Sequence, residues 1–241
     1  METISYVALS GQVALERRMA ALANNVANAG TVGYRGGGFH VGTWLDRTSR
    51  LPTAFAADGD AHVMTGSGGL VRTGNPLDVA IQGQGFLAVQ TPDGVVYTRD
   101  GRMQMLPTGE LVSLNGYPVL DPGGAPLVAN PAAGPPEIGR DGMINQDGRR
   151  VGAIGLFAVD MQSGYRRYEN SGFIPAATPE PIVSFTQDGV VQGFTESANV
   201  NPVLEMTNLI RITRAFEAMA AALEQNDAAQ KNAIQTLGAR S

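Results

Sequence analysis

The sequence predicts an α+β fold, in which long N- and C-terminal α-helices form a coiled-coil-like domain and an antiparallel β-rich domain lies between them. Helix-breaking residues are concentrated in the middle, because all 14 prolines and all but two of the 31 glycines lie between Gly30 and Pro202. Apolar residues recur at helical spacing near both ends. Asp-Gly pairs, which favour tight hairpins, recur between them.

The first segment has one narrow apolar stripe. Thr3 is placed to cap the start of a helix, and the Asn28–Gly30 turn is placed to end it. Residues three or four apart lie on one helix face, and the stripe consists of Ile4, Ala8, Gly11, Leu15, Met19, Leu22 and Val26.

The last segment has a more regular stripe, with steps that alternate between three and four residues. Asn201-Pro202 marks its start, because proline is favoured in the first turn of a helix. The pattern predicts a coiled-coil seam that is weakened by its polar members. The seam consists of Met206, Leu209, Thr213, Phe216, Ala220, Leu223, Asp227, Gln230, Ile234 and Leu237.

The middle of the chain reads as short strands. Segments rich in Val, Ile and Phe predict strands at 78–91, 95–100, 110–114, 153–160 and 181–194. Asp-Gly pairs predict hairpin turns at 93–94, 100–101, 141–142, 147–148 and 188–189. Residues 47–62 and 130–142 are expected to be loops or connectors.

The domain bounds follow from these changes of pattern. We expect an N-terminal helix over 1–34, an extended connector over 35–75, a β-rich domain over 76–190 and a C-terminal helix over 191–241.

Composition narrows the class of protein. The chain of 241 residues has a net charge of -5 and a pI near 5.0 without a run of basic residues, so nucleic acid is not an expected partner. Its apolar runs fall far short of the roughly 20 residues of a spanning helix, so membrane insertion is not expected. The N-terminus lacks the pattern of a secretory signal. Because there is no cysteine, disulfides and thiolate metal sites are excluded.

A search for chemistry returns no catalytic residue, cofactor site or metal site. The segment "GQGFLA" (83–88) has dinucleotide-motif spacing, but it continues as a strand where that motif needs a helix. His40 and His62 have no second ligand at metal spacing. The chain is therefore not expected to be an enzyme.

The two terminal stripes stand out instead. Apolar residues also lie off the stripes, for example Val13, Val203 and Ile210, and two helices cannot cover several faces of each other. We therefore expect the ends to be poorly ordered in a free subunit and to fold on contact with other copies. Amides form hydrogen bonds without carrying charge, so asparagines at the end of the first helix suit a crowded interior.

The expected assembly interface combines both helices. Its residues are Ile4, Ala8, Leu15, Met19, Leu22, Asn24, Asn25, Val26, Asn28, Met206, Leu209, Phe216, Ala220, Leu223, Ile234 and Leu237.

Three blocks of the sequence carry a family resemblance. The chain resembles bacterial flagellar rod and hook proteins, the hook–basal-body proteins, over nearly its whole length and in the right order. The blocks are "LANNVANAGTVGYR" (22–35), the central "LVRTGNPLDVAIQGQGFLAV" (70–89) with "YTRDGRM" (97–103) and "GELVSLNGYPVL" (109–120), and "ESANVNPVLEMTNLIRITRAFEA" (196–218).

The resemblance implies a structural subunit of the flagellar basal-body rod, which crosses the periplasm and transmits torque from motor to hook. It implies an inner layer built from both terminal helices, with the β-domain outside. The implied partners are proximal and distal rod proteins, the surrounding ring proteins and the flagellar type III export apparatus.

Three assignments stay open at this point. The short length and the start "ISYVALSG" (4–11) favour a proximal rod subunit. A distal rod or hook subunit is the alternative within the family. A β-domain binding protein or hydrolase with helical dimerisation arms is the alternative from another class.

Overall fold

The computed structural model describes residues 2–46 and 53–238, and the side chains of residues 2–5, 46, 53, 57, 58 and 237 lie outside the description. The chain divides into two compact units. The helical unit contains residues 1–27, 37–62 and 201–241, and the β unit contains residues 28–36 and 63–200.

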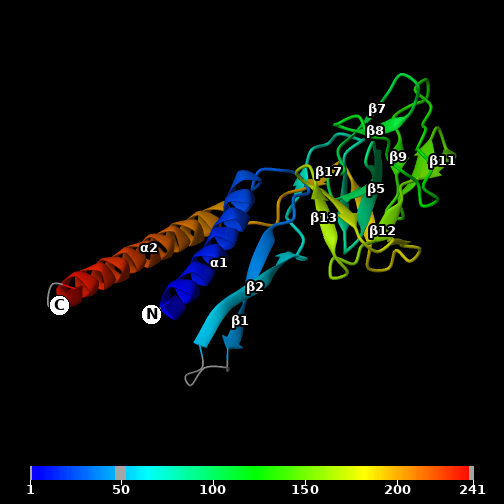
Figure 1. Ribbon diagram of the computed structural model, residues 1–241. Helices are drawn as coiled ribbons and strands as arrows, with labels where there is room; N and C mark the ends of the chain where they lie inside the picture. Colours follow the sequence, from blue (N-terminus) through cyan, green and yellow to red (C-terminus); the bar gives the residue numbers. More distant parts are fainter. Residues whose placement is uncertain (1, 47–52, 239–241) are drawn as a thin grey trace. The chain divides into compact units, whose positions relative to one another are not determined.

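Two helices and one hairpin make up the helical unit. Helices α1 (Glu2–Ala27) and α2 (Pro202–Gly238) lie side by side and antiparallel, so both termini lie at the same end of this unit (Figure 1). A helix is present at each end of the chain as predicted, but α1 ends at Ala27, before the expected boundary at 34, and α2 begins at Pro202, after the expected boundary at 191. The start of α2 is as expected, since the side-chain Oδ1 of Asn201 accepts the backbone N–H of Val203 at 3.1 Å and of Leu204 at 3.3 Å.

The hairpin is a correction to the sequence-based expectation. Strands β1 (Gly37–Asp46) and β2 (Thr53–Val63) pair with each other, so the expectation of loops was wrong for residues 53–62, while residues 47–52 lie outside the described residues. The side-chain Oγ of Ser10 on α1 accepts the backbone N–H of Ala56 at 3.2 Å. The guanidinium of Arg17 lies 5.8 Å from the ring centroid of Phe39. These contacts between distant segments are not visible in the local sequence.

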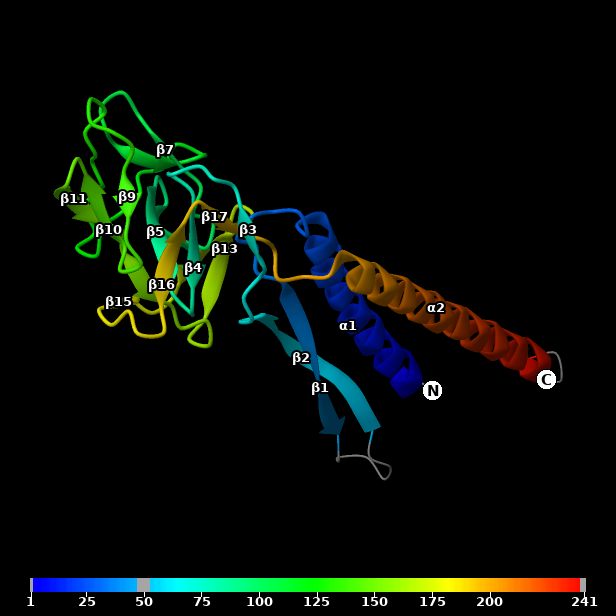
Figure 2. The same cartoon turned by 180° about the vertical axis from the view of Figure 1, so that it is seen from behind.

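The β unit consists of short antiparallel strands in several small sheets, as predicted for the middle of the chain (Figures 1 and 2). A six-stranded sheet has the order β13-β14-β6-β5-β12-β15, and β11-β10-β9 form a second sheet. Figure 2 shows the pairs β16-β4 and β17-β3. The strands are β3 (Leu70–Arg72), β4 (Val79–Gln82), β5 (Phe86–Thr91), β6 (Gly94–Thr98), β7 (Met103–Met105), β8 (Leu111–Ser113), β9 (Glu137–Ile138), β10 (Met143–Gln146), β11 (Arg149–Ala153), β12 (Leu156–Ala158), β13 (Tyr165–Tyr168), β14 (Gly172–Pro175), β15 (Glu180–Pro181), β16 (Gly189–Gln192) and β17 (Phe194–Glu196).

Three of the five Asp-Gly hairpin predictions are confirmed. The pairs at 93–94, 141–142 and 147–148 join β5 to β6, β9 to β10 and β10 to β11. The predictions at 100–101 and 188–189 were wrong. Gly101 instead allows a close approach, because a Cβ there would lie 1.9 Å from the carbonyl oxygen of Val79.

Burial differs greatly between the two units. The β unit has two apolar clusters, the larger around residues such as Val79, Leu111 and Ile144. Among the described side chains of the helical unit, only Ala14, Asn25, Glu205 and Ile212 are buried. Neither α1 nor α2, as far as they are described, has a window long and apolar enough to cross a bilayer.

Candidate functional site

The stripe predicted on α1 lies against α2 within the helical unit. Its described interface members are half-buried, namely Ala8, Leu15, Met19, Leu22 and Val26. The hydroxyl of Thr213 on α2 donates to the Sδ of Met19 at 3.7 Å. Gly11 lets the helices approach closely, because a Cβ there would lie 3.0 Å from the Cε of Met219. The side chain of Ile4 lies outside the described residues.

The residues predicted on α2 fall into two groups. Four are half-buried, namely Leu209, Phe216, Ala220 and Leu223. Met206 is 50% exposed and Ile234 is 70% exposed. The side chain of Leu237 lies outside the described residues. The predicted seam is therefore covered only in its central part.

Large apolar side chains off the stripes are also exposed on both helices. Val203 is 71% exposed and Ile210 is 55% exposed on α2. Tyr6 at 62% and Leu9 at 54% are exposed on α1, and sequence reasoning missed both. The signal was present, since Tyr6, Leu9 and Val13 recur at helical spacing as a second row.

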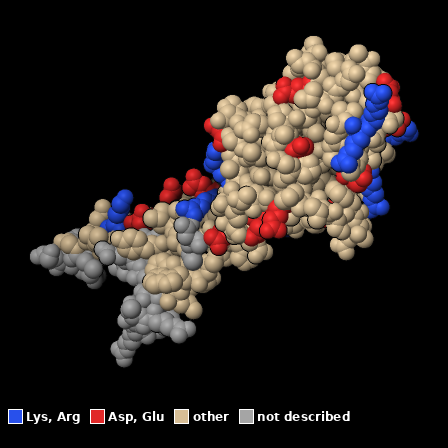
Figure 3. Space-filling model, turned by 90° about the vertical axis from the view of Figure 1, so that its right-hand side faces the viewer, with Lys and Arg blue, Asp and Glu red and all other residues tan. Residues whose placement is uncertain are grey.

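A groove of about 330 Å³ runs beside this second row. Phe39 of β1 and Ala56 of β2 line it from the hairpin. From α1 it is lined by Tyr6, Leu9, Ser10, Val13, Ala14 and Arg17, so it is mostly apolar with one charged residue. Figure 3 shows that most of the described surface on its visible face carries neither acidic nor basic side chains. The helical unit presents exposed apolar rows on two helices and a mostly apolar groove.

Asn25 links three segments of the helical unit. Its Nδ2 donates to the carbonyl of Gly37 at 2.8 Å and to the Oε2 of Glu205 at 3.0 Å, and its Oδ1 accepts the Gly37 N–H at 2.8 Å. The side chain is fully buried. A primary amide can donate and accept at once, which neither a carboxylate nor an apolar group can do here.

The other two asparagines of the predicted interface lie elsewhere. Asn24 is exposed on α1. Asn28 lies in the turn after the helix, where its Oδ1 accepts the hydroxyl of Thr31 at 3.2 Å and its carbonyl accepts the Thr31 N–H at 2.9 Å. The structure therefore does not bring the three amides together.

We expect Asn25→Asp to remove most of the residual helix that the free subunit keeps at neutral pH. The change deletes both Nδ2 donors and places a carboxylate beside Glu205, at a cost of about 1–3 kcal/mol or more. Far-UV circular dichroism over a pH series measures the effect. Protonation of either carboxyl group restores a donor, so acid should recover the signal. Asn24→Asp makes the same charge change at an exposed position, where water solvates the carboxylate, and should lower the helix signal much less. Equal spectra for the two variants would refute this role of Asn25.

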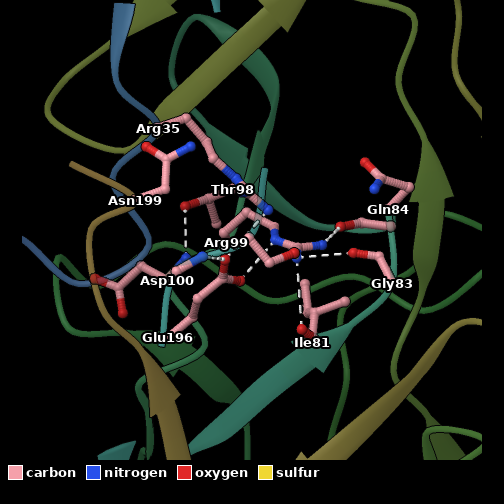
Figure 4. A network of polar contacts seen from close by, with 12 residues as sticks. Arg35, Ile81, Gly83, Gln84, Thr98, Arg99, Asp100, Glu196 and Asn199 are labelled. Carbon is pink, nitrogen blue, oxygen red and sulfur yellow. Dashed lines mark hydrogen bonds and ion pairs between the residues drawn. The ribbon is translucent and has the colours of Figure 1, made fainter. Parts of the chain in front are cut away.

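A buried ionic cluster lies in the β unit (Figure 4). The carboxylate of Glu196 lies between two guanidinium groups, with its Oε1 3.1 Å from Nη2 of Arg35 and its Oε2 2.8 Å from Nε of Arg99. All three side chains are at most 3% exposed. Gly68 donates its N–H to the Glu196 Oε1 at 2.8 Å. We call Arg35, Arg99 and Glu196 the ionic cluster.

Backbone carbonyls complete the hydrogen bonding of the two arginines. Arg35 donates to the carbonyls of residues 65 and 66. Arg99 donates to the carbonyls of residues 81, 83 and 85, where β4 turns into β5, and to the hydroxyl of Ser67 at 3.2 Å. Its guanidinium also lies 5.6 Å from the ring centroid of Phe86. These bonds give the buried guanidinium groups acceptors in addition to the Glu196 carboxylate.

Both arginines remain cations at neutral pH. Burial lowers the pKa of Arg35 to about 10, with a further lowering from the charge of Arg99, and Glu196 opposes the shift. Burial also lowers the pKa of Arg99, again against the effect of Glu196. The cluster therefore holds two positive charges and one negative charge, with Asp188 as a further carboxylate that acts on Arg99.

Sequence reasoning missed the ionic cluster. Its members are 64 and 97 residues apart along the chain, and charged residues next to glycine-rich turns read as surface positions. The available signal was the resemblance, because one member lies in each of the three blocks that carry it. The three blocks meet in one place.

Three family models match the chain. They are "Flagella basal body rod protein" at residues 6–35, "Flagellar hook protein FlgE/F/G D1 domain" at residues 80–149 and "Flagellar basal body rod FlgEFG protein C-terminal" at residues 191–236. Arg35, Arg99 and Glu196 lie in the first, second and third of these matches.

Curated relatives cover the whole chain. It is 48% identical to "Flagellar basal-body rod protein FlgF" of Mesorhizobium japonicum over 100% of both chains, and 44% identical to the FlgF protein of Rhizobium meliloti over 99% of both. "Flagellar basal-body rod protein FlgG" of Bacillus subtilis is 28% identical over 92% of this chain and 94% of the relative. The chain therefore belongs to the flagellar basal-body rod protein family, as an FlgF-like structural subunit of the rod.

Proposed function

We propose that this proximal rod subunit assembles through the exposed apolar rows of α1 and α2, which neighbouring rod subunits cover. The observation that carries the proposal is the small number of buried side chains in the helical unit, four among the described residues. A pair of helices with a two-stranded hairpin has too little core to be stable alone in water. Neighbouring helices would supply the missing core.

In this proposal each subunit offers its neighbours two helix faces. Val203, Met206 and Ile210 share one face of α2, at the spacing by which a helix enters an apolar groove. The row Tyr6, Leu9 and Val13, with the groove beside it, offers a receiving surface of matching character. The coiled-coil pairing expected for the helices belongs to this assembled state. Close-packed helices have low compressibility, which suits a shaft that transmits torque from motor to hook.

The proposed partners are the other proximal and distal rod proteins, with ring proteins around them. The proposed route to the rod is the flagellar type III export apparatus, as the family resemblance implies. A distal rod role is disfavoured by the lower identity to FlgG proteins, 28% against 48% for an FlgF protein. The hydrolase alternative has no support among these relatives, which are named as structural rod proteins.

Circular dichroism of the free and assembled forms tests the proposal. Helices α1 and α2 have 26 and 37 residues, about a quarter of the chain. We expect clearly less helix in the dilute free subunit, because its helical unit lacks cover, and the full amount in assembled rods. An equal helix content in both forms, with a cooperative unfolding transition of the free helices, would contradict the proposal.

A further inference from the structure

The ionic cluster lies within the β unit, and two of its three members are close in sequence to points where the chain continues into the helical unit. The chain crosses from one unit to the other after residues 27, 36, 62 and 200. Within the β unit, Arg35 comes directly before one crossing, its carbonyl partners at 65 and 66 come shortly after another, and Glu196 comes shortly before a third. The cluster therefore ties together three segments of the β unit that continue into the helical unit.

Backbone hydrogen bonds and one amide join the same three segments. Asn199 accepts the Gly36 N–H at 2.6 Å through its Oδ1, and its Nδ2 donates to the carbonyls of Met64 at 3.0 Å and Gly66 at 2.7 Å. The Met64 N–H donates to the carbonyl of Gly36 at 2.8 Å, and the Gly33 N–H donates to the carbonyl of Glu196 at 2.7 Å. Figure 4 shows Asn199 beside the cluster. Every segment is held to the other two.

Burying these charges is a poor way to stabilise the β unit. Two guanidinium groups and one carboxylate lose their hydration, and replacement of such a triad by packed apolar side chains is often neutral or stabilising. The geometric demand, in contrast, is strict. The three segments must keep one arrangement for Glu196 to contact both arginines while the arginines donate to the carbonyls of residues 65, 66, 81, 83 and 85.

We propose that Arg35, Arg99 and Glu196 are positioning residues that set the arrangement of the three connecting segments for rod assembly and are not needed for the stability of the β unit. This proposal rests on the proposed function, because the proposed function is what assigns an assembly role to α1 and α2. Arg99 links the Glu196 carboxylate to the β4–β5 turn. Arg35 links the segment after β2 to the same carboxylate. The two arginines thus have separable roles.

The first test replaces the whole cluster in the full-length chain with apolar groups of similar volume, through Arg35→Met, Arg99→Met and Glu196→Leu together. The thermal midpoint of the β unit is followed by near-UV circular dichroism of tyrosine, since five of the six tyrosines lie in that unit. We expect a midpoint at or above that of the parent and at least a tenfold loss of swimming and of rods in isolated basal bodies. Parent-like swimming, or a β unit that no longer folds, would each overturn the proposal.

The second test compares loss of the cationic hydrogen-bond donor at position 35 with its retention. Arg35→Met leaves Glu196 paired with Arg99, so the β unit stays folded, but amide exchange at Met64 should quicken at least tenfold and swimming should fall at least tenfold. Arg35→Lys keeps a cation with three donors for the carboxylate and the two carbonyls, and should restore both. Equal swimming for the two variants would refute the positioning role.

A control variant and a separate test on α2 distinguish failure of the positioning role from failure of the proposed function. Arg102 forms a more exposed ion pair with Asp100 at 2.6 Å, so Arg102→Met removes an ion pair outside the cluster and should swim like the parent. If Ile210→Asp on α2 leaves assembly intact, the proposed function fails. If Ile210→Asp abolishes assembly and the triple variant swims normally, only the positioning role fails.

Discussion

Ile210→Asp is expected to abolish rod assembly and swimming while leaving the β unit folded. Ile210 is 55% exposed on the face that it shares with Val203 and Met206. If a neighbouring subunit covers this face, the new carboxylate is buried without a partner, which costs several kcal/mol. A loss of about 3 kcal/mol lowers the association constant about 100-fold.

Swimming in soft agar and the yield of rods in isolated basal bodies measure the effect. Ile210→Leu keeps the apolar volume and should assemble normally. Aspartate at Leu209 or Phe216, which are half-buried on α2, should also stop swimming and should in addition remove residual helix from the free subunit. Unimpaired swimming of Ile210→Asp would show that this face stays in water.

Glu196→Leu is expected to destabilise the β unit by about 3–5 kcal/mol, because it leaves two buried guanidinium groups without their carboxylate. For a unit of this size the change corresponds to a fall in the thermal midpoint of roughly 6–20 °C. Near-UV circular dichroism of tyrosine during thermal unfolding measures it. Removing both arginines as well should recover the stability, since no charge is then unpaired. If Glu196→Leu alone is as stable as the parent, the backbone carbonyls are sufficient to compensate both buried cations, and the prediction is wrong.

The helices could be predicted from the sequence because their signals are local. Apolar spacing marks α1 and α2, and the Asn201-Pro202 pair marks the start of α2. The Asp-Gly turns at 93–94 and 147–148 are local for the same reason.

The hairpin of β1 and β2 could not be predicted in this way. Its first strand is rich in glycine, which is unfavourable in strands. The pairing depends instead on contacts with α1, such as the bond from Ala56 to Ser10. The Asp-Gly pair at 188–189 misled for a related reason, since the Asp188 carboxylate accepts the N–H of Gln84 at 2.6 Å. Tertiary contacts decide both cases.

For the candidate sites, too, local sequence signals identified some features, while others depend on tertiary contacts. The two helices could be named as assembly elements from periodicity, but which rows face inward depends on how α1 and α2 pack. Tyr6 and Leu9 were missed because the stripe beside them is more regular. The ionic cluster was missed because charge at Arg35, Arg99 and Glu196 indicates exposure until the fold buries it.

Covering of the helix faces by sister subunits is tested most directly by thiol labelling. The chain has no cysteine, so single cysteines at Leu9, Val203 and Ile210 can be labelled with a maleimide one at a time. We predict rapid labelling in the free subunit and at least tenfold slower labelling in intact rods isolated from swimming cells. Labelling at the same rate in both states at all three positions would contradict the account.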